Sequence, residues 1–454
     1  MVTDIKTYIE ENQSRFLEEL FGLLRIPSVS PDPQHKNDMH RAAEYVCNAL
    51  LEAGADAARV LSTTGNPVVF GEKTIGKGKP TVLVYGHYDV MPIEPVESWK
   101  SPPFEPEIRD GRIWARGAND DKGQLFMHLK AFEYLVRSQT LECNVKFMIE
   151  GEEEIGSESL KEFCTQNKEM LSADVILVSD TSMIEENIPS ITVGLRGICY
   201  FEVEIAGPNR ELHSGLYGGA VINPANALAK IISKLTDDQY KVKIPGFYDD
   251  VEEISESERN ELNKTPFRLE EFKDSIGIFD AAGETGYSTL ERIGIRPSLD
   301  VNGIWGGYTG EGTKTIIPSK AYAKISTRLV PHQDPEKIRG LFEKHLLQIA
   351  PEGVNVVVKY LHGGAGYVSP VSSKAYHAAS MAYEKVFGKK PIPVRSGGSI
   401  PIIAEFERLL GLKSILMGFG LDSDAIHSPN ENFRLNVFLK GIETISYFYS
   451  FFSE

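Results

Sequence analysis

Five short segments of the chain carry histidines and acids of the types that bind metal ions. His87 and Asp89 follow the apolar run TVLVY, and the three glutamates 152–154 follow the run NVKFMIEG. The remaining candidates are Asp120 and Asp121 in ARGANDDKG, Asp180 after DVILVS, and His427 in LDSDAIHSPNE. Imidazoles and carboxylates are common ligands of divalent transition metals. Because the segments lie far apart in the sequence, only the fold can bring them together.

Acids gathered at this density require cations, because like charges at one site destabilise one another's ionised forms. Imidazoles and carboxylates without a thiolate suit zinc, manganese or cobalt better than magnesium, which prefers oxygen ligands and keeps its waters. Charge balance indicates two divalent ions. Paired ions usually lie ~3.5–4 Å apart and hold an activated water between them. Zinc is the favoured cofactor, and manganese and cobalt stay open because they accept the same ligands.

The elements around these residues predict an α/β fold with a mainly parallel sheet. The apolar runs TVLVY (81–85), NVKFMIE (144–150) and DVILVS (174–179) read as buried strands, and 123–136 has the apolar spacing of a helix. Strands that alternate with helices are typical of a parallel sheet covered on both faces. In such sheets the ligand crevice lies outside the carboxyl ends of the strands, where the candidate residues follow.

The pattern changes near residue 194. The runs GICYFEVEIAG and KAYAKISTRLVP interleave polar and apolar residues, as in a half-exposed sheet, and each is followed by a helical segment. Two such pairs indicate a small α+β domain of the ferredoxin-like type. After the glycine-rich HGGAGY the first pattern returns. We therefore expect a domain inserted at 195–366 into a discontinuous domain formed by 1–194 and 367–454.

Composition narrows the class of function. The formal net charge of −16 argues against a nucleic acid or an anionic membrane surface as partner. No apolar run is long enough to span a bilayer, and the N-terminal segment lacks a signal-peptide core. The 4 cysteines are scattered without a C-x-x-C pair, which is typical of reduced thiols. A cytoplasmic protein is expected.

The motifs GHYDV, ARGANDDKG, EGEEEIGS, ILVSD and AIHSPNE, in this order, resemble those of the di-metal peptidases of the aminoacylase/carnosinase group, peptidase family M20. The resemblance spans essentially the whole chain. The long 240–300 segment and the GGSIP loop place it nearest the cytosolic carnosinase-like dipeptidases. It implies that the inserted domain is a lid and dimerisation domain, and that the protein is a homodimer.

The resemblance also implies a role for each residue of the site. The implied ligands are His87, Asp120 and Asp180 for one ion and Asp120, Glu154 and His427 for the other, with Asp120 bridging. Glu153 would be the general base that deprotonates the metal-bridging water and then protonates the leaving amine. Asp89 would hydrogen-bond His87 and fix its tautomer. The I-G-S that follows the glutamates sets their register and leaves Glu152 as an extra acid.

Further residues are implied in substrate binding. His213, in RELHSGLYGG, would stabilise the tetrahedral oxyanion, often from the partner subunit in this family. Thr315 and Arg328, in KTIIP and ISTRLVP, resemble residues that bind the substrate carboxylate. Arg395 and Ser399, in RSGGSIP, resemble the carnosinase-type loop. An arginine suits a free carboxylate because its planar fork donates two parallel hydrogen bonds.

Structural roles compete with these assignments. Taken alone, His87 reads as a buried core histidine, and the glutamates read as the first turn of a helix, where acids are favoured. His213 could serve a turn, and Arg328 and Arg395 could form surface ion pairs. Structural roles are preferred for Glu152, for Asp121 as a helix N-cap, and for Asp422 and Asp424 as loop acids near His427.

The sequence therefore predicts a metal-dependent hydrolase that cleaves the amide bond of a dipeptide or similar small substrate with a free carboxylate. An N-acyl amino acid deacylase, whether deacetylase, desuccinylase or aminoacylase, has the same chemistry and is the nearest alternative. A non-catalytic metal-binding protein on this fold is less favoured, because the catalytic glutamate and His213 are present.

Overall fold

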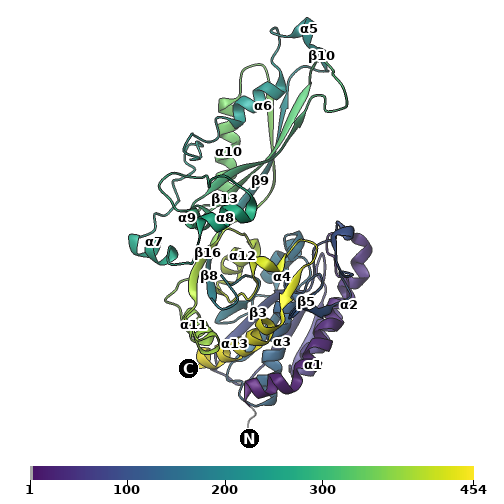
Figure 1. Cartoon of the computed structure of the whole chain (residues 1–454), viewed down its shortest axis with the longest axis vertical. Coiled ribbons are helices and arrows are strands. Elements are labelled where there is room, and N and C mark those ends of the chain that lie inside the picture. The colour runs from purple at the N-terminus through teal and green to yellow at the C-terminus, as the bar shows by residue number, and fades with distance from the viewer. Residues whose placement is uncertain (1–3) are drawn as a thin grey trace. The chain divides into compact units, whose positions relative to one another are not determined.

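The computed structural model of the chain describes residues 4–454, which form two compact units (Figure 1). The first unit comprises Met1–Val193, Ser369–Val394 and Glu405–Glu454, and the second comprises Gly194–Val368 and Arg395–Ala404. The segment Arg395–Ala404 falls within the predicted 367–454 stretch but groups with the second unit. Its contacts explain this, because Arg395 pairs with Glu258 and the backbone of Gly397 accepts from Arg196. The lid and dimerisation roles of 195–366 stay predictions.

A nine-stranded mixed sheet has the order β1-β2-β6-β3-β7-β17-β8-β15, with β16 paired to β8, and all of it except β15 and the last two residues of β8 and of β16 belongs to the first unit. Its strands are β1 (Ala57–Leu61), β2 (Val68–Lys73), β3 (Thr81–His87), β6 (Asn144–Glu150), β7 (Val175–Val178), β8 (Ser190–Leu195), β15 (Tyr367–Val368), β16 (Ile392–Ser396) and β17 (Ser414–Leu416). Pairing is parallel from β6 through β3 and β7 to β17 and antiparallel in the flanks. The α/β prediction is confirmed, and the predicted strands at 81–85, 144–150 and 174–179 are β3, β6 and β7.

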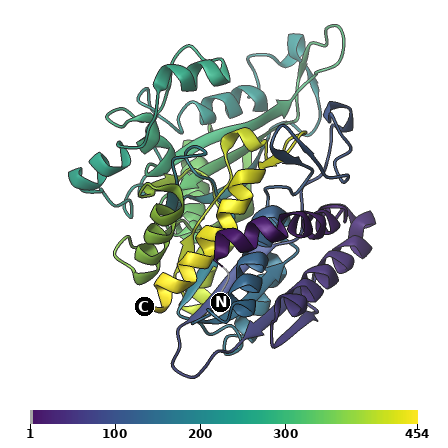
Figure 2. The same ribbon diagram turned by 60° about the horizontal axis from the view of Figure 1, so that its bottom comes forward.

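Helices cover this sheet and supply most of the core. They are α1 (Ile5–Leu24), α2 (Lys36–Ala53), α3 (Lys122–Arg137), α4 (Glu158–Gln166), α11 (Lys374–Phe387), α12 (Pro401–Leu410) and α13 (Leu435–Ser453). Helix α3 contacts α1, α2 and α13, which explains why its residues are buried almost throughout (Figure 1). Alternate residues of β3 face opposite sides of the sheet: Val82 and Val84 join this helical core, whereas Tyr85 packs edge-on against Phe406 of α12. Figure 2 shows the N-terminal α1 beside the C-terminal α13, which it contacts.

A small antiparallel sheet joins two distant segments of the first unit. It has the order β18-β5-β4, from β4 (Glu107–Arg109), β5 (Arg112–Trp114) and β18 (Asn432–Arg434). Asn432 pairs with Trp114 in this ladder. The segment that carries His427 therefore runs beside the start of the loop that carries Asp120.

The second unit has a four-stranded antiparallel sheet in the order β11-β13-β9-β14. Its main elements are β9 (Gly197–Ala206), α6 (Pro224–Ile232), β11 (Ser298–Gly306), β13 (Lys320–Leu329), α10 (Pro335–Ile349) and β14 (Asn355–Gly364). Smaller elements are β10 (Leu212–His213), α5 (Ser214–Tyr217), α7 (Glu256–Leu262), α8 (Leu269–Ile276), α9 (Thr289–Gly294) and β12 (Ile316–Ile317). The chain order β-α-β-β-α-β with this pairing is the ferredoxin-like arrangement expected from the sequence.

Apolar residues of α6 and α10 pack on the sheet in a core of their own, in which Phe201 of β9 stacks on Phe342 of α10. None of the helices among residues 4–454 combines the length and the apolar character needed to cross a membrane.

Candidate metal centre

The carboxyl ends of the parallel strands bring the predicted ligands together. His87 is the last residue of β3, and Asp180 lies two residues beyond β7, which pairs with β3 in parallel. Glu154 lies in the short 3-10 helix Glu153–Ile155 that follows β6. The chain thus returns to one edge of the sheet after each strand, as expected for an open α/β sheet.

Two groups of side chains form there, and they share Asp120. In the first group, Nε2 of His87 lies 3.2 Å from Oδ1 of Asp120 and 4.0 Å from Oδ2 of Asp180. In the second, Nε2 of His427 lies 2.9 Å from Oδ2 of Asp120 and 3.1 Å from Oε2 of Glu154. Asp120 therefore presents one carboxylate oxygen to each group.

The donor atoms fit divalent cations. In the part of the chain that the structure describes, Nε2 of His87 and Oε1 of Glu154 are buried and have no hydrogen-bond partner. An unpaired polar atom of this kind is costly unless something binds it. Each group combines an imidazole with carboxylates and contains no thiolate. This donor set matches zinc, manganese or cobalt.

The pKa values of two acids and one histidine at the site also indicate a place for a cation. Burial, reinforced by neighbouring acids, raises the pKa of Glu153 to about 8. Burial likewise raises the pKa of Glu154 to about 7. Hydrogen bonds to Asp120 and Glu154 raise the pKa of His427 to about 10. A cation reverses these directions, because it favours ionised carboxylates and neutral imidazole.

Asp89 lies on the other side of the His87 ring. Its Oδ1 is 3.3 Å from Nδ1 of His87, and its backbone oxygen is 3.1 Å from the same nitrogen. The carboxylate also accepts from Oγ of Ser30 at 2.6 Å and from the backbone N–H groups of Glu153 and Glu154 at 3.3 and 3.2 Å. Asp89 therefore orients the imidazole and anchors the turn that carries both glutamates.

The neighbouring acids have structural contacts. Glu152 accepts from the backbone N–H groups of Asn66 and Ser159 at 2.8 and 3.1 Å, which agrees with its interpretation as the extra acid. Asp121 occupies the N-cap position of α3, but its side chain does not cap the helix. It accepts from the backbone N–H of His87 at 3.1 Å instead, so it holds the end of β3.

Four of the five substrate-binding candidates of the second unit form two pairs, and the fifth, Arg395, pairs with an acid. His213 and Thr315 adjoin because β10 pairs with β12: Nδ1 of His213 accepts from the N–H of Gly215 at 2.9 Å, and the carbonyl of Thr315 accepts from the N–H of Ser214 at 3.0 Å. Arg328 donates to Oγ of Ser399 at 2.8 Å. Arg395 donates to Glu258 at 2.7 Å, so its guanidinium is already engaged in an ion pair.

Residues 83–450 match the sequence model of peptidase family M20/M25/M40. The chain belongs to this family. It is 32% identical to the Cys-Gly metallodipeptidase dug1 of Schizosaccharomyces pombe, covering 96% of this chain and 95% of the relative. It is 30% identical to the Beta-Ala-His dipeptidase of Homo sapiens, covering 97% and 91%. The M20 family metallo-carboxypeptidase Sso-CP2 from Sulfolobus solfataricus has a crystal structure that matches with a TM-score of 0.87 at 34% identity, covering 96% and 99%. The expected family is confirmed, and this peptidase is a hydrolytic enzyme.

Two acids of the peptidase have more specific contacts than the sequence indicates. Asp424, interpreted as a loop acid, is buried and accepts from Nδ2 of Asn119 at 2.7 Å and from the N–H of Leu421 at 2.9 Å. Glu431, the last residue of AIHSPNE, is buried and accepts four hydrogen bonds. Its presence in that motif is the only signal in the sequence, because burial of a loop acid leaves no local pattern.

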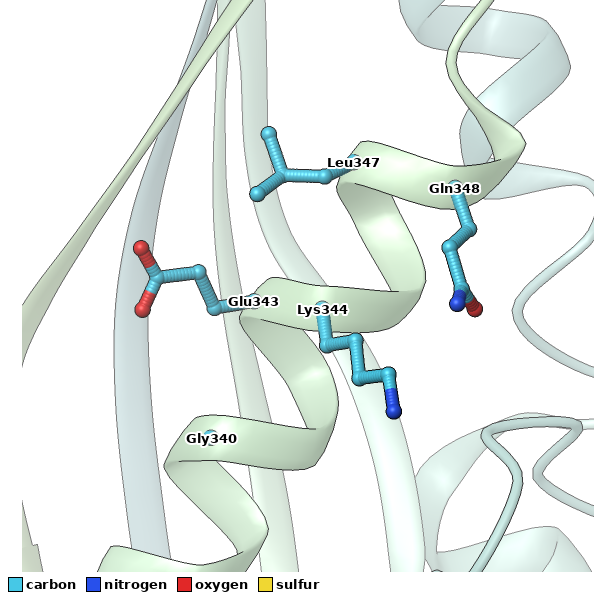
Figure 3. A pocket seen from close by; sticks show the side chains of 5 residues that line it. All are labelled: Gly340, Glu343, Lys344, Leu347 and Gln348. Atoms are coloured by element: carbon cyan, nitrogen blue, oxygen red, sulfur yellow. The ribbon is translucent and has the colours of Figure 1, made fainter.

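The peptidase also has a surface pocket on α10, lined by Gly340, Glu343, Lys344, Leu347 and Gln348 (Figure 3). These side chains project from successive turns of one helix and diverge from one another. The pocket contains neither histidine nor aspartate, so it lacks the chemistry of the metal centre.

Proposed function

We propose that the peptidase binds two divalent cations and hydrolyses the amide bond of dipeptides with a free carboxylate. The observation that carries this proposal is the shared Asp120, whose two oxygens serve two adjoining groups of ligand types. The proposed ligands are His87, Asp120 and Asp180 for one ion and Asp120, Glu154 and His427 for the other. Zinc is the preferred metal, with manganese and cobalt as alternatives.

When bound, the two ions would polarise the scissile carbonyl and lower the pKa of the attacking water. Glu153 acts as the general base: its carboxylate takes the proton of that water and delivers it to the leaving amine. Its pKa, raised to about 8 by burial among the protein's own groups, falls when cations are bound, so the carboxylate is then ionised and able to accept a proton. The backbone and carboxylate oxygens of Asp89 both face Nδ1 of His87, and by accepting from Nδ1–H they would keep Nε2 unprotonated.

The substrate class is supported by the relatives. The Schizosaccharomyces pombe relative is named for Cys-Gly and the human relative for Beta-Ala-His, both of which are dipeptides. Arg328, supported by Ser399, would bind the free carboxylate, and His213 with Thr315 would bind the oxyanion side of the substrate. Arg395 would contribute only by exchanging its partner Glu258 for substrate. The N-acyl amino acid deacylase alternative has no stronger support from the comparisons.

We also propose that the peptidase is a homodimer and works in the cytoplasm. The dimer follows from the family resemblance of the RELHSGLYGG segment. The compartment is supported by four buried cysteines, Cys47, Cys143, Cys164 and Cys199, which form no disulfide.

A substrate panel tests the proposal. The protein is stripped with chelator, reconstituted with zinc or manganese, and assayed on dipeptides and, in parallel, on N-acyl amino acids. We expect metal-dependent hydrolysis of dipeptides with a higher kcat/KM than for any N-acyl substrate. Preferential hydrolysis of the N-acyl substrates would establish the deacylase, and binding of two ions without turnover of any amide would establish a non-catalytic protein.

A further inference from the structure

The carboxylate of Glu431 lies behind the loop that carries Asp120. It is 0% exposed and accepts four hydrogen bonds from that loop. Its Oε1 accepts from the backbone N–H groups of Asn119 and Asp120, both at 3.0 Å. Its Oε2 accepts from the N–H of Gly117 at 2.9 Å and from Nη1 of Arg116 at 2.8 Å.

This pattern is more than an ion pair. Arg116, 1% exposed, neutralises Glu431 and also donates to the carbonyl of Pro92 at 2.8 Å. The ion pair with Arg116 uses only one of the two carboxylate oxygens of Glu431. Glu431 instead receives three backbone N–H groups of the 117–120 loop, whose directions are set by the backbone conformation. The side chain therefore fixes how this loop is folded.

The same residue links the two ligand segments. Glu431 is four positions beyond His427, and β18 begins at the next residue and pairs with β5. Asp424, three positions before His427, adds a second link between the same segments, because its carboxylate accepts from Nδ2 of Asn119 at 2.7 Å. Nε2 of His427 lies 2.9 Å from Oδ2 of Asp120. These two ligands are more than 300 residues apart in sequence, and the contacts of Glu431 and Asp424 hold their segments together.

We propose that Glu431 is a positioning residue for Asp120 and thereby sets the affinity of the centre for both cations. The inference rests on the metal binding proposed above. Asp120 presents one oxygen to each ligand group, so a rotation of its backbone displaces a ligand of both ions at once. His87 and His427 each belong to one group, so their loss acts first on one ion. If Glu431 positions Asp120, its substitution should therefore lower the affinity for both ions together.

Two variants test this. Glu431→Gln keeps the shape but replaces one acceptor oxygen by an N–H₂ donor that faces N–H groups. Glu431→Asp keeps the charge beside Arg116 but withdraws the oxygens from the backbone of Asn119 and Asp120. The matched control is Glu133→Gln, which changes a buried acid of α3 that pairs with Arg15 of α1 and with Lys130 of α3.

The stripped full-length proteins are titrated with Mn²⁺ by calorimetry, bound metal is counted by atomic absorption, and folding is checked by circular dichroism. We expect both Glu431 variants to bind both ions about 10- to 100-fold more weakly than the wild type, the usual effect of losing a partner of a metal ligand. Glu133→Gln should lose thermal stability and keep both affinities.

The outcomes separate the two proposals. If the wild type fails to bind two ions, the proposed function is wrong whatever the variants do. If the wild type binds two ions and a folded Glu431 variant binds them equally well, or loses only one, the positioning role is wrong. If Glu431→Gln does not fold, Glu431→Asp decides by the same criterion. Failure of both variants to fold would also overturn the inference, because the carboxylate would then serve the core rather than the metal centre.

Discussion

The carboxylate of Asp89 lies 3.3 Å from Nδ1 of His87, on the side of the ring that faces away from Asp120. We expect Asp89→Asn to weaken binding of the ion held by His87 about 10- to 100-fold, because the amide no longer enforces the tautomer with Nε2 free. The other ion should be weakened less, since its group lacks His87 and Asp89 contacts only the backbone N–H of its ligand Glu154. Metal counting after dialysis against graded chelator measures this. Retention of both ions at wild-type affinity would mean that the backbone oxygen of Asp89 suffices to orient the ring.

Glu153 can be separated from its neighbour Glu154 by substitution. Glu153→Gln should lower kcat by about 10²- to 10⁴-fold, the range for loss of a general base, while both ions stay bound. Glu154→Gln should instead lose metal, since Glu154 belongs to the ligand group of His427. Steady-state kinetics and metal counting on both variants distinguish the two roles. Substantial activity in Glu153→Gln would assign the base elsewhere.

Arg328 offers a test of carboxylate binding. Its guanidinium donates to Oγ of Ser399 through Nη1, and its remaining N–H groups would donate to the substrate carboxylate. Arg328→Met should lower kcat/KM for dipeptides about 10- to 100-fold, the loss expected for hydrogen bonds to a charged group. The matched control is Arg339→Met, which removes an exposed arginine paired with Glu336 on α10. Equal kinetics for both variants would show that the carboxylate binds elsewhere.

His128 should make the folded state sensitive to acid. Burial lowers the pKa of its imidazole to about 3, against ~6.5 in an unfolded chain. As the pH falls, the unfolded state therefore binds a proton before the folded state does. The contribution of neutral His128 to the free energy of unfolding is fully present above pH ~6.5. Below that pH it falls by up to about 1.4 kcal/mol per pH unit. His128→Gln keeps a partner for Ser179, which lies 2.8 Å from Nε2, and removes the titration.

The measurement is the free energy of unfolding between pH 4 and 8, in chelator so that metal binding does not contribute. The wild type should lose more stability than the variant as the pH falls through ~6.5. Parallel curves for the two proteins would show that His128 does not titrate on unfolding in this range.

The positions of His87, Glu154 and Asp180 could be predicted because each lies at or just beyond the end of a strand with a clear apolar pattern. The run before His87 is apolar and β-branched, so it is a buried strand, and its end lies at the edge where such sheets bind ligands. The motif order then separated Glu153 and Glu154 from Glu152, whose contacts with Asn66 and Ser159 are structural.

Other features could not be predicted because they depend on contacts between distant segments. Asp424 reads as a loop acid until its hydrogen bond with Asn119, 305 residues away, is known. Asp121 occupies a helix N-cap, yet its carboxylate contacts the backbone of β3, a choice that the local sequence does not specify. The partner of Arg395 is Glu258, in a segment whose helices carry no distinctive motif.

The interrupted path of the chain through the first unit has a consequence for biosynthesis. Residues 197–364 form a sheet with its own core, and they leave the ribosome as one continuous stretch. Helix α13 and His427 are translated after the second unit, so until then α3 lacks one of its three helical neighbours and the second ligand group lacks its imidazole. We expect proteolysis of stalled nascent chains to show the second unit protected before the first. The metal centre, although its first ligand is residue 87, would then mature only after the second unit has folded.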